Sequence, residues 1–153
     1  MPPYQRGSFN LSLYDLTNTS TPLRMMLVTT DYTYDADHDT VDDGTTSDPA
    51  SYEIGVGGYS RQDLANVARF VDDTNDFAGL DADNVTFSSL SAGATIGAAV
   101  VFRYSTSGTT SDTGQELLGD YPVTATPTNG GDITIQLAAT SDGGLYKLVS
   151  TSS

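Results

Sequence analysis

The chain contains no cysteine, and it has a single histidine, His38. The absence of cysteine excludes disulfide bonds, thiolate zinc sites and cysteine nucleophiles. A lone histidine removes most of the nucleophile–base pairs on which hydrolases depend, and it has no second His or Cys beside it to share a metal ion. The fold must therefore be held together by core packing, and no cofactor is predicted.

Basic residues are also scarce. Six Lys and Arg stand against twenty Asp and Glu, which gives a formal net charge of −14, and Lys147 is the only lysine. A surface this acidic repels nucleic acid and anionic membranes, so neither is predicted as a partner. No apolar run approaches the roughly 20 residues of a membrane span. Met1 to Gly7 lacks the apolar core of a secretory signal, so none is predicted.

Ser, Thr, Gly and Asp are the residues that the chain has in quantity. The hydrophobic fraction is 37% and the charged fraction 17%, and this composition is typical of a loop-rich all-β domain. A length of 153 residues fits one domain, or one domain with an arm. Pro2, Pro3 and Gly7 discourage regular structure. We therefore predict an extended arm over residues 1–8, a β domain over 9–150 and a short tail over 151–153.

Residues 96–104, IGAAVVFRY, have the nearly continuous apolar pattern of a strand that is covered on both faces. Residues 23–30, LRMMLVTT, predict another strong strand, which is wholly apolar from Met25 to Val28. Residues 84–90 instead alternate apolar and polar side chains, which indicates a strand with one buried face. The loop at 91–94 contains Gly93, which can adopt a positive φ. We predict that 84–90 and 96–104 form the central hairpin of the fold.

Further strand patterns follow the same logic along the chain. Residues 9–13 alternate apolar and polar side chains, and another strand is expected near Phe70 and Val71. Residues 116–123 predict an edge strand, because Pro122 interrupts them. The last two predicted strands are residues 132–137 and 145–149. Polar or Gly-rich turns separate them at 55–58, 72–76 and 129–131. The prediction is a single β-sandwich or partly closed barrel of about eight mostly antiparallel strands.

The most acidic segment, residues 31–49, contains three aspartates at alternate positions. Asp35, Asp37 and Asp39 have the spacing of the first ligands of a calcium loop. The EF-hand pattern also needs Gly at its sixth position and Glu at its twelfth, where this chain has Thr40 and Thr46. A solvated acidic loop is the preferred interpretation, with these three aspartates as weak candidates for a cation site.

Motifs of enzymatic sites are missing. There is no Gly-x-Ser-x-Gly and no phosphate-binding loop with Lys, and the glycines of GVGGYS at 55–60 do not form a dinucleotide fingerprint. Asp81 and Asp83 are the neatest pair of carboxylates for a glycosidase. A turn in which these carboxylates accept backbone N–H bonds is the simpler interpretation. We therefore expect no enzymatic activity.

Several motifs, taken in order, carry a resemblance. They are YEIGVGGYSRQDLANV at 52–67, DADNVTFSSL at 81–90, TIGAAVVFRY at 95–104, a Ser/Thr loop, and TNGGDITIQL at 128–137. Over roughly residues 23–149 the chain resembles a family of small virion proteins of tailed bacteriophages. Asn84 stands where that family has Asp, and the 31–49 loop has its own acidic sequence.

The resemblance implies a structural role, as a head decoration (cement) protein on the outer surface of the capsid. Such a protein would bind the major capsid protein, clamp neighbouring subunits and self-associate, often as a homotrimer. It supplies no catalytic residues. Candidate contacts with the capsid or with another subunit are residue types enriched at interfaces, in the arm and the first predicted strand: Tyr4, Arg6, Phe9 and Tyr14.

Two alternatives are kept. A carbohydrate-binding or fibre-attachment module would present exposed tyrosines, such as Tyr32 and Tyr34, beside the acidic loop. A neck or tail component would form rings of a different symmetry, with far fewer copies in each particle.

Overall fold

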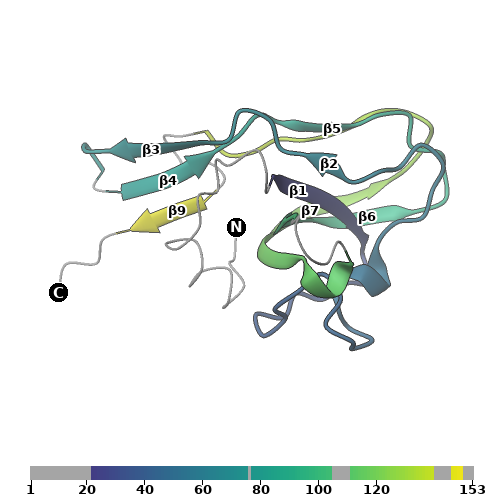
Figure 1. Ribbon diagram of the computed structural model, residues 1–153. Coiled ribbons are helices and arrows are strands. Elements are labelled where there is room, and N and C mark those ends of the chain that lie inside the picture. Colours follow the sequence, from purple (N-terminus) through teal and green to yellow (C-terminus); the bar gives the residue numbers. More distant parts are fainter. Residues whose placement is uncertain (1–21, 76, 105–110, 140–145, 150–153) are drawn as a thin grey trace.

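The computed structural model describes residues 22–75, 77–104, 111–139 and 146–149, and the regular secondary structure of these residues is almost entirely β-strand (Figure 1). The predicted arm over 1–8, the predicted strand over 9–13 and the tail over 151–153 lie outside these residues. The strands are β1 (Leu23–Thr29), β2 (Gln62–Asp63), β3 (Ala68–Asp72), β4 (Phe77–Asp81), β5 (Val85–Phe87), β6 (Thr95–Arg103), β7 (Glu116–Pro127), β8 (Ile133–Ile135) and β9 (Tyr146–Val149). Two short 3-10 helices, η1 (Pro49–Tyr52) and η2 (Asp112–Gly114), lie between them. The all-β prediction is confirmed.

The principal sheet has the order β2-β1-β6-β7, and all its pairings are antiparallel. The two strands with continuous apolar sequences, β1 and β6, occupy its centre. Met25 lies opposite Val101 and Met26 opposite Val100, and all four side chains are fully buried. Successive side chains of a strand point to opposite faces, so a strand that is apolar throughout can be buried only if both faces of its sheet are covered.

Two hydrophobic clusters cover the two faces of this sheet. The first takes Met25, Leu27 and Val101 from β1 and β6, and Val85 and Phe87 from β5. The second takes the alternate residues of β1 and β6, and the acidic loop and η1 contribute further side chains to it: Val41, Tyr32, Tyr34, Ala50 and Tyr52. Burying a large apolar side chain contributes about 1.5–3 kcal/mol. The two clusters are therefore the main source of stability for a chain without disulfide bonds.

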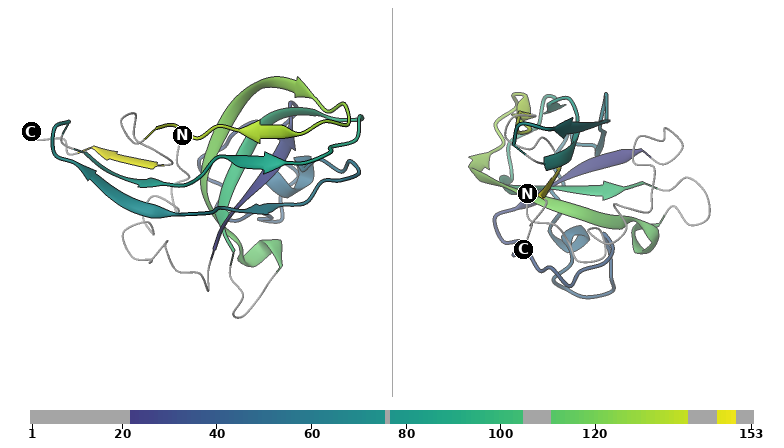
Figure 2. Two further views of the ribbon diagram at one scale, coloured as in Figure 1. Left: turned by 90° about the horizontal axis from the view of Figure 1, so that it is seen from above. Right: turned by 90° about the vertical axis from the view of Figure 1, so that its left-hand side faces the viewer.

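Two smaller sheets complete the structure. β5 pairs with β8, and β3, β4 and β9 form a sheet of order β3-β4-β9. Figure 2 shows that the β3–β4 hairpin extends away from the principal sheet. The hairpin is closed by the turn predicted at 72–76, where the Asp72 carboxylate accepts backbone N–H bonds from Thr74 and Asn75. The strand character of 77–81 was missed in the sequence.

The predicted central hairpin is wrong, although both of its strands exist. β5 pairs with β8, whereas β6 pairs with β1 and β7. The reason is the difference in their burial patterns. β6 needs neighbours on both edges and cover on both faces, while β5, with only Val85 and Phe87 buried, belongs in a covering layer. The segment between them, with Gly93 at φ 138° as expected, therefore crosses from one sheet to another.

The prediction of an edge strand over 116–123 is confirmed, because β7 lies at the end of the principal sheet. Pro122 does not end this strand, which continues to Pro127.

Two glycines are required by close packing elsewhere. A Cβ on Gly97 would lie 2.7 Å from Thr30 Cα. Gly58 has φ +82°, and a Cβ there would overlap the Ser89 carbonyl oxygen.

Candidate functional site

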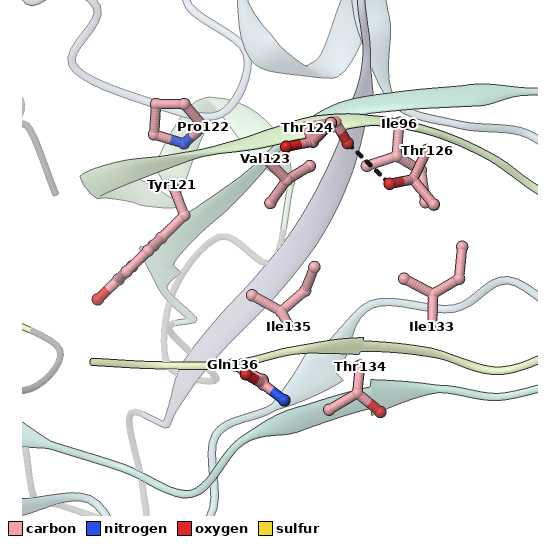
Figure 3. Close-up of a pocket in the computed structure, with 10 residues that line it drawn as sticks. All are labelled: Ile96, Tyr121, Pro122, Val123, Thr124, Thr126, Ile133, Thr134, Ile135 and Gln136. Atoms are coloured by element: carbon pink, nitrogen blue, oxygen red, sulfur yellow. Dashed lines mark hydrogen bonds between the residues drawn. The ribbon is translucent and has the colours of Figure 1, made fainter. Parts of the chain in front are cut away.

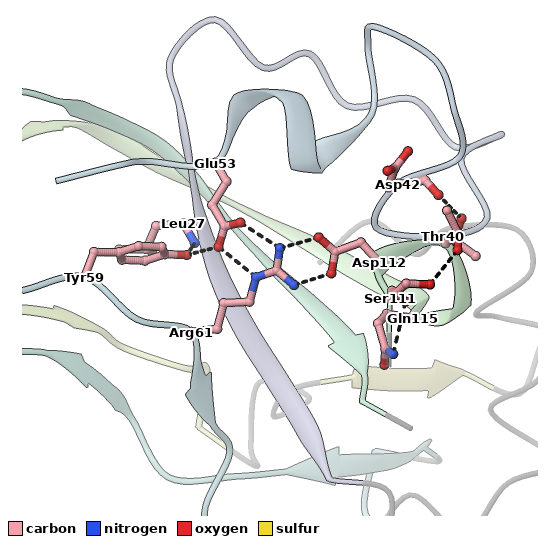
Figure 4. A network of polar contacts seen from close by, with 10 residues as sticks. Leu27, Thr40, Asp42, Glu53, Tyr59, Arg61, Ser111, Asp112 and Gln115 are labelled. Carbon is pink, nitrogen blue, oxygen red and sulfur yellow. Dashed lines mark hydrogen bonds and ion pairs between the residues drawn. The ribbon is translucent and has the colours of Figure 1, made fainter. Parts of the chain in front are cut away.

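The most extensive polar arrangement among the described residues is centred on Arg61, just before β2 (Figure 4). Its guanidinium binds Glu53 with two bonds, Nε to Oε1 at 2.8 Å and Nη2 to Oε2 at 2.7 Å. It binds Asp112 in η2 with two more, Nη1 to Oδ1 at 2.6 Å and Nη2 to Oδ2 at 2.9 Å. Bidentate Arg–carboxylate pairs are stronger than hydrogen bonds between neutral groups. We call Arg61, Glu53, Asp112 and Tyr59 the Arg61 cluster.

Tyr59 connects the Arg61 cluster to the principal sheet. Its hydroxyl donates to Glu53 Oε1 at 2.6 Å and accepts the Leu27 backbone N–H at 3.1 Å. Burial, followed by the Glu53 carboxylate, raises the pKa of Tyr59 above its usual range. The Tyr59 side chain packs against the first hydrophobic cluster, and its hydroxyl reaches the backbone of β1.

The electrostatics of the Arg61 cluster favour a structural role. Burial alone would lower the pKa of Arg61, but the hydrogen bonds and charges of Glu53 and Asp112 outweigh it and raise this pKa. The guanidinium carbon also lies 5.3 Å from the centre of the Phe102 ring. The guanidinium is thus held by two carboxylates and a ring, and the cluster joins β1, the segment after η1, the start of β2 and η2.

The carboxylates of the acidic loop close the turns of that loop. Asp35 Oδ1 accepts the Asp37 N–H at 3.0 Å, Asp42 Oδ1 accepts the Gly44 N–H at 2.9 Å, and Asp48 caps η1 by accepting the Ser51 N–H. Among the residues that the structure describes, no group of three or more His, Asp or Glu is placed to hold a metal ion. The weak cation site at Asp35, Asp37 and Asp39 therefore gains no supporting geometry.

This loop is also less solvated than predicted. His38 is buried, with Nε2 3.4 Å from Ser47 Oγ and 3.8 Å from Asp43 Oδ2. Tyr32 and Tyr34 are half-buried against the second hydrophobic cluster, where Tyr32 contacts Tyr52 at 6.0 Å between ring centres. The expectation of exposed tyrosines beside acidic side chains is therefore wrong, because the second face of the principal sheet needs these rings as cover.

A groove of about 290 Å³ runs between the second half of β7 and β8 (Figure 3). Apolar side chains form much of it, with threonines and a glutamine among them, and no charged residue lines it. Burial, followed by the nearby Asp81, raises the pKa of Tyr121 at one end. The groove therefore offers apolar surface together with hydroxyl and amide groups that can form hydrogen bonds. The lining residues are Ile96, Tyr121, Pro122, Val123, Thr124, Thr126, Ile133, Thr134, Ile135 and Gln136.

Asp120 is a buried carboxyl on β7, 3% exposed and opposite Val100 of β6. Its Oδ1 has no hydrogen-bond partner in the described part of the chain. Burial raises the pKa of Asp120 to about 6. Burial, followed by the charge of Asp120, also raises the pKa of Tyr34.

The candidate contact residues Tyr4, Arg6, Phe9 and Tyr14 lie outside the described residues. Of the carboxylate pair, Asp81 ends β4, and the Asp83 carboxylate accepts an N–H from the Asn66 side chain at 2.7 Å. This is a side-chain donor and not the backbone N–H that the turn prediction required.

The Arg61 cluster was missed in the sequence. Arg61 and Asp112 are 51 positions apart, and nothing local links them. The one available signal was the scarcity of cations. Six basic residues among so many carboxylates are each expected to pair, and Arg24 and Arg103 do so with Asp63 and Glu116.

Comparison with known proteins identifies no relative. No protein-family profile matches the chain, and neither the curated proteins nor the solved structures contain a significant match. Among the described residues, no helix is long and apolar enough to cross a membrane.

Proposed function

We propose that the chain is a structural virion protein that binds the outside of a bacteriophage capsid and clamps neighbouring major capsid subunits. The observation that carries the proposal is that the described motif residues behind the family resemblance have roles in building the fold. Gly58 makes a close turn against Ser89. Asn129 Oδ1 accepts the Gly131 N–H at 3.0 Å in the turn before β8. The motifs that carry the resemblance therefore build the scaffold of this chain.

The strongest polar contacts support the same proposal. The Arg61 cluster and the loop aspartates form bonds within the chain, which stiffens the body of the domain. A stiff body loses little conformational freedom on binding and is suited to a clamp. The formal charge of −14 also disfavours binding to DNA and to anionic cell envelopes.

The partners in this proposal are the major capsid protein and other copies of the chain, as a homotrimer. The arm residues Tyr4 and Arg6, with Phe9 and Tyr14, supply the contacts. The carbohydrate-binding alternative loses its exposed tyrosine platform, because Tyr32 and Tyr34 pack against the second hydrophobic cluster. The neck or tail alternative differs from capsid decoration in copy number, because it predicts far fewer copies of the chain in each particle.

The experiment is co-sedimentation of the purified chain with capsids of the same virus that lack it. Saturable binding in a fixed ratio to the major capsid protein is expected. A chain without residues 1–8 should fold and fail to bind, while a Thr46→Ala variant, changed at an exposed loop position, should bind like the unaltered chain. Absence of saturable binding by the unaltered chain would refute the proposal.

A further inference from the structure

The sequence contains one Asn-Gly pair, Asn129–Gly130, which lies in the turn between β7 and β8. An asparagine followed by glycine is the arrangement most prone to deamidation, because glycine has no Cβ to shield its backbone nitrogen or to restrict its approach to the preceding side chain. Both residues are exposed, so water and base reach them. The sequence alone therefore predicts spontaneous loss of this side-chain amide.

Deamidation at this pair would follow a definite course. The backbone nitrogen of Gly130 attacks Cγ of Asn129, so that a C–N bond forms, the bond from Cγ to Nδ2 breaks, and the proton of the Gly130 N–H passes through solvent to the departing ammonia. Water then adds to one of the two carbonyl carbons of the cyclic imide and reopens the ring. The products are ammonia and a chain with aspartate or isoaspartate at position 129, which carries an additional negative charge at neutral pH.

The structure activates the side chain and blocks the nitrogen. Asn129 Oδ1 accepts the Gly131 N–H at 3.0 Å, and this donor would stabilise the negative charge that the oxygen gains when Cγ is attacked. Gly130, with φ 93°, donates its own N–H to the Leu90 carbonyl oxygen at 2.6 Å. A nitrogen that donates this bond retains its proton and cannot attack, so the contact with Leu90 must open before the reaction begins.

Two further bonds hold that contact in place. The Leu90 N–H donates to the Gly131 carbonyl oxygen at 3.0 Å, and the Ser89 N–H donates to Asp132 Oδ1 at 2.8 Å. The Leu90 side chain is fully buried in the first hydrophobic cluster, which restrains its carbonyl group. We call the two segments that these bonds join, residues 89–90 and 129–132, the closed turn.

We propose that Asn129 is a latent deamidation site, which the closed turn protects and which reacts when that turn opens. Isoaspartate at this position would insert an additional carbon atom into the main chain before β8. It would thereby disturb the register of β8 with β5, in which Val85 lies opposite Ile135. The closed turn therefore protects the chain against a change that would weaken one of its covering sheets. The proposal concerns the chain itself and does not depend on the capsid role.

The test compares the folded chain with the chain unfolded in urea. Both are incubated at mildly alkaline pH and digested, and mass spectrometry quantifies the peptides with aspartate or isoaspartate at position 129. The folded chain should deamidate there at least about tenfold more slowly, because the reaction requires local opening. Asn66 and Asn84, each followed by valine, are internal controls and should react slowly in both states, because a β-branched side chain hinders the attack. Equal rates at Asn129 in the two states would overturn the proposal.

A substitution within the closed turn tests whether this contact controls the reaction. Asp132→Ala removes the acceptor of the Ser89 N–H and should raise the deamidation rate of the folded chain by about threefold or more, with the rate in urea unchanged. Asp73→Ala, in the turn between β3 and β4, is the matched control and should leave both rates unchanged. Both aspartates are exposed, so the variants should fold, and circular dichroism checks that they do. If Asp132→Ala leaves the rate of the folded chain unchanged, the closed turn does not control the reaction and the proposal is wrong.

Discussion

Replacing Asp120 with Asn should stabilise the protein at neutral and alkaline pH and have little effect in acid. Asp120 is 3% exposed, and burial raises its pKa from the ordinary 3.8 to about 6. The folded state therefore holds the proton more tightly than the unfolded state does. The stability that this group contributes is fully present below pH 3.8 and is lost as the pH rises through about 6.

The magnitude follows from the same numbers. A rise from 3.8 to about 6 corresponds to about 3 kcal/mol of lost stability at pH 8, at about 1.4 kcal/mol for each pH unit. The buried amide of Asn also needs hydrogen-bond partners, which reduces the gain. We therefore expect Asp120→Asn to raise the free energy of unfolding at pH 8 by about 1–3 kcal/mol, or the melting temperature by about 3–10 °C.

The assay is urea or thermal unfolding of both proteins between pH 4 and pH 8. The stability difference should grow from pH 4 upwards and level off above pH 7. Asp73→Asn removes the same charge from an exposed site and should change stability by less than about 0.5 kcal/mol at every pH. A difference between Asp120→Asn and the unaltered chain that does not vary with pH would refute the reasoning.

Three further predictions follow from the packing, and urea unfolding measures each of them. Arg61→Met should destabilise by about 2–4 kcal/mol, because it leaves two half-buried carboxylates without their cation; a loss below about 0.5 kcal/mol would mean that the cluster is not structural. Gly58→Ala should lower the free energy of unfolding by more than about 2 kcal/mol, because φ is +82° and the new Cβ meets a carbonyl oxygen. Gly55→Ala, where a Cβ has open space, should be nearly neutral. Equal effects of the two substitutions would contradict the close approach at Gly58. Tyr59→Phe should cost about 1–2 kcal/mol through the two hydrogen bonds of its hydroxyl, and an unchanged stability would contradict their geometry.

The strands were largely predictable from the sequence, and their partners were not. The alternation of Val85 and Phe87 identifies a strand with one buried face, and the apolar run of β6 identifies one buried on both. Neither pattern says which strands are neighbours, because pairing depends on how the whole chain covers its apolar faces. Proximity along the chain favoured a hairpin between β5 and β6, but the two-sided burial of β6 placed β1 and β7 beside it.

The polar sites were the least predictable part. Asp120 has no local feature that indicates burial, since its neighbours Val100 and Tyr34 come from segments distant in sequence. The same is true of Arg61, whose two carboxylates arrive from the segment after η1 and from η2. Turns were predictable because their chemistry is local. The Asp72 carboxylate accepts the N–H of Thr74, two residues on, and Gly130 adopts a positive φ of 93°.

The central claim is that this chain is an abundant structural component of a virus shell, and the copy number in purified particles tests it most directly. Quantitative gel densitometry or mass spectrometry of virions from the virus that encodes the chain would give its ratio to the major capsid protein. The claim predicts a fixed ratio of the same order as the capsid subunits themselves. A count of only a few copies in each particle, or none, would contradict it.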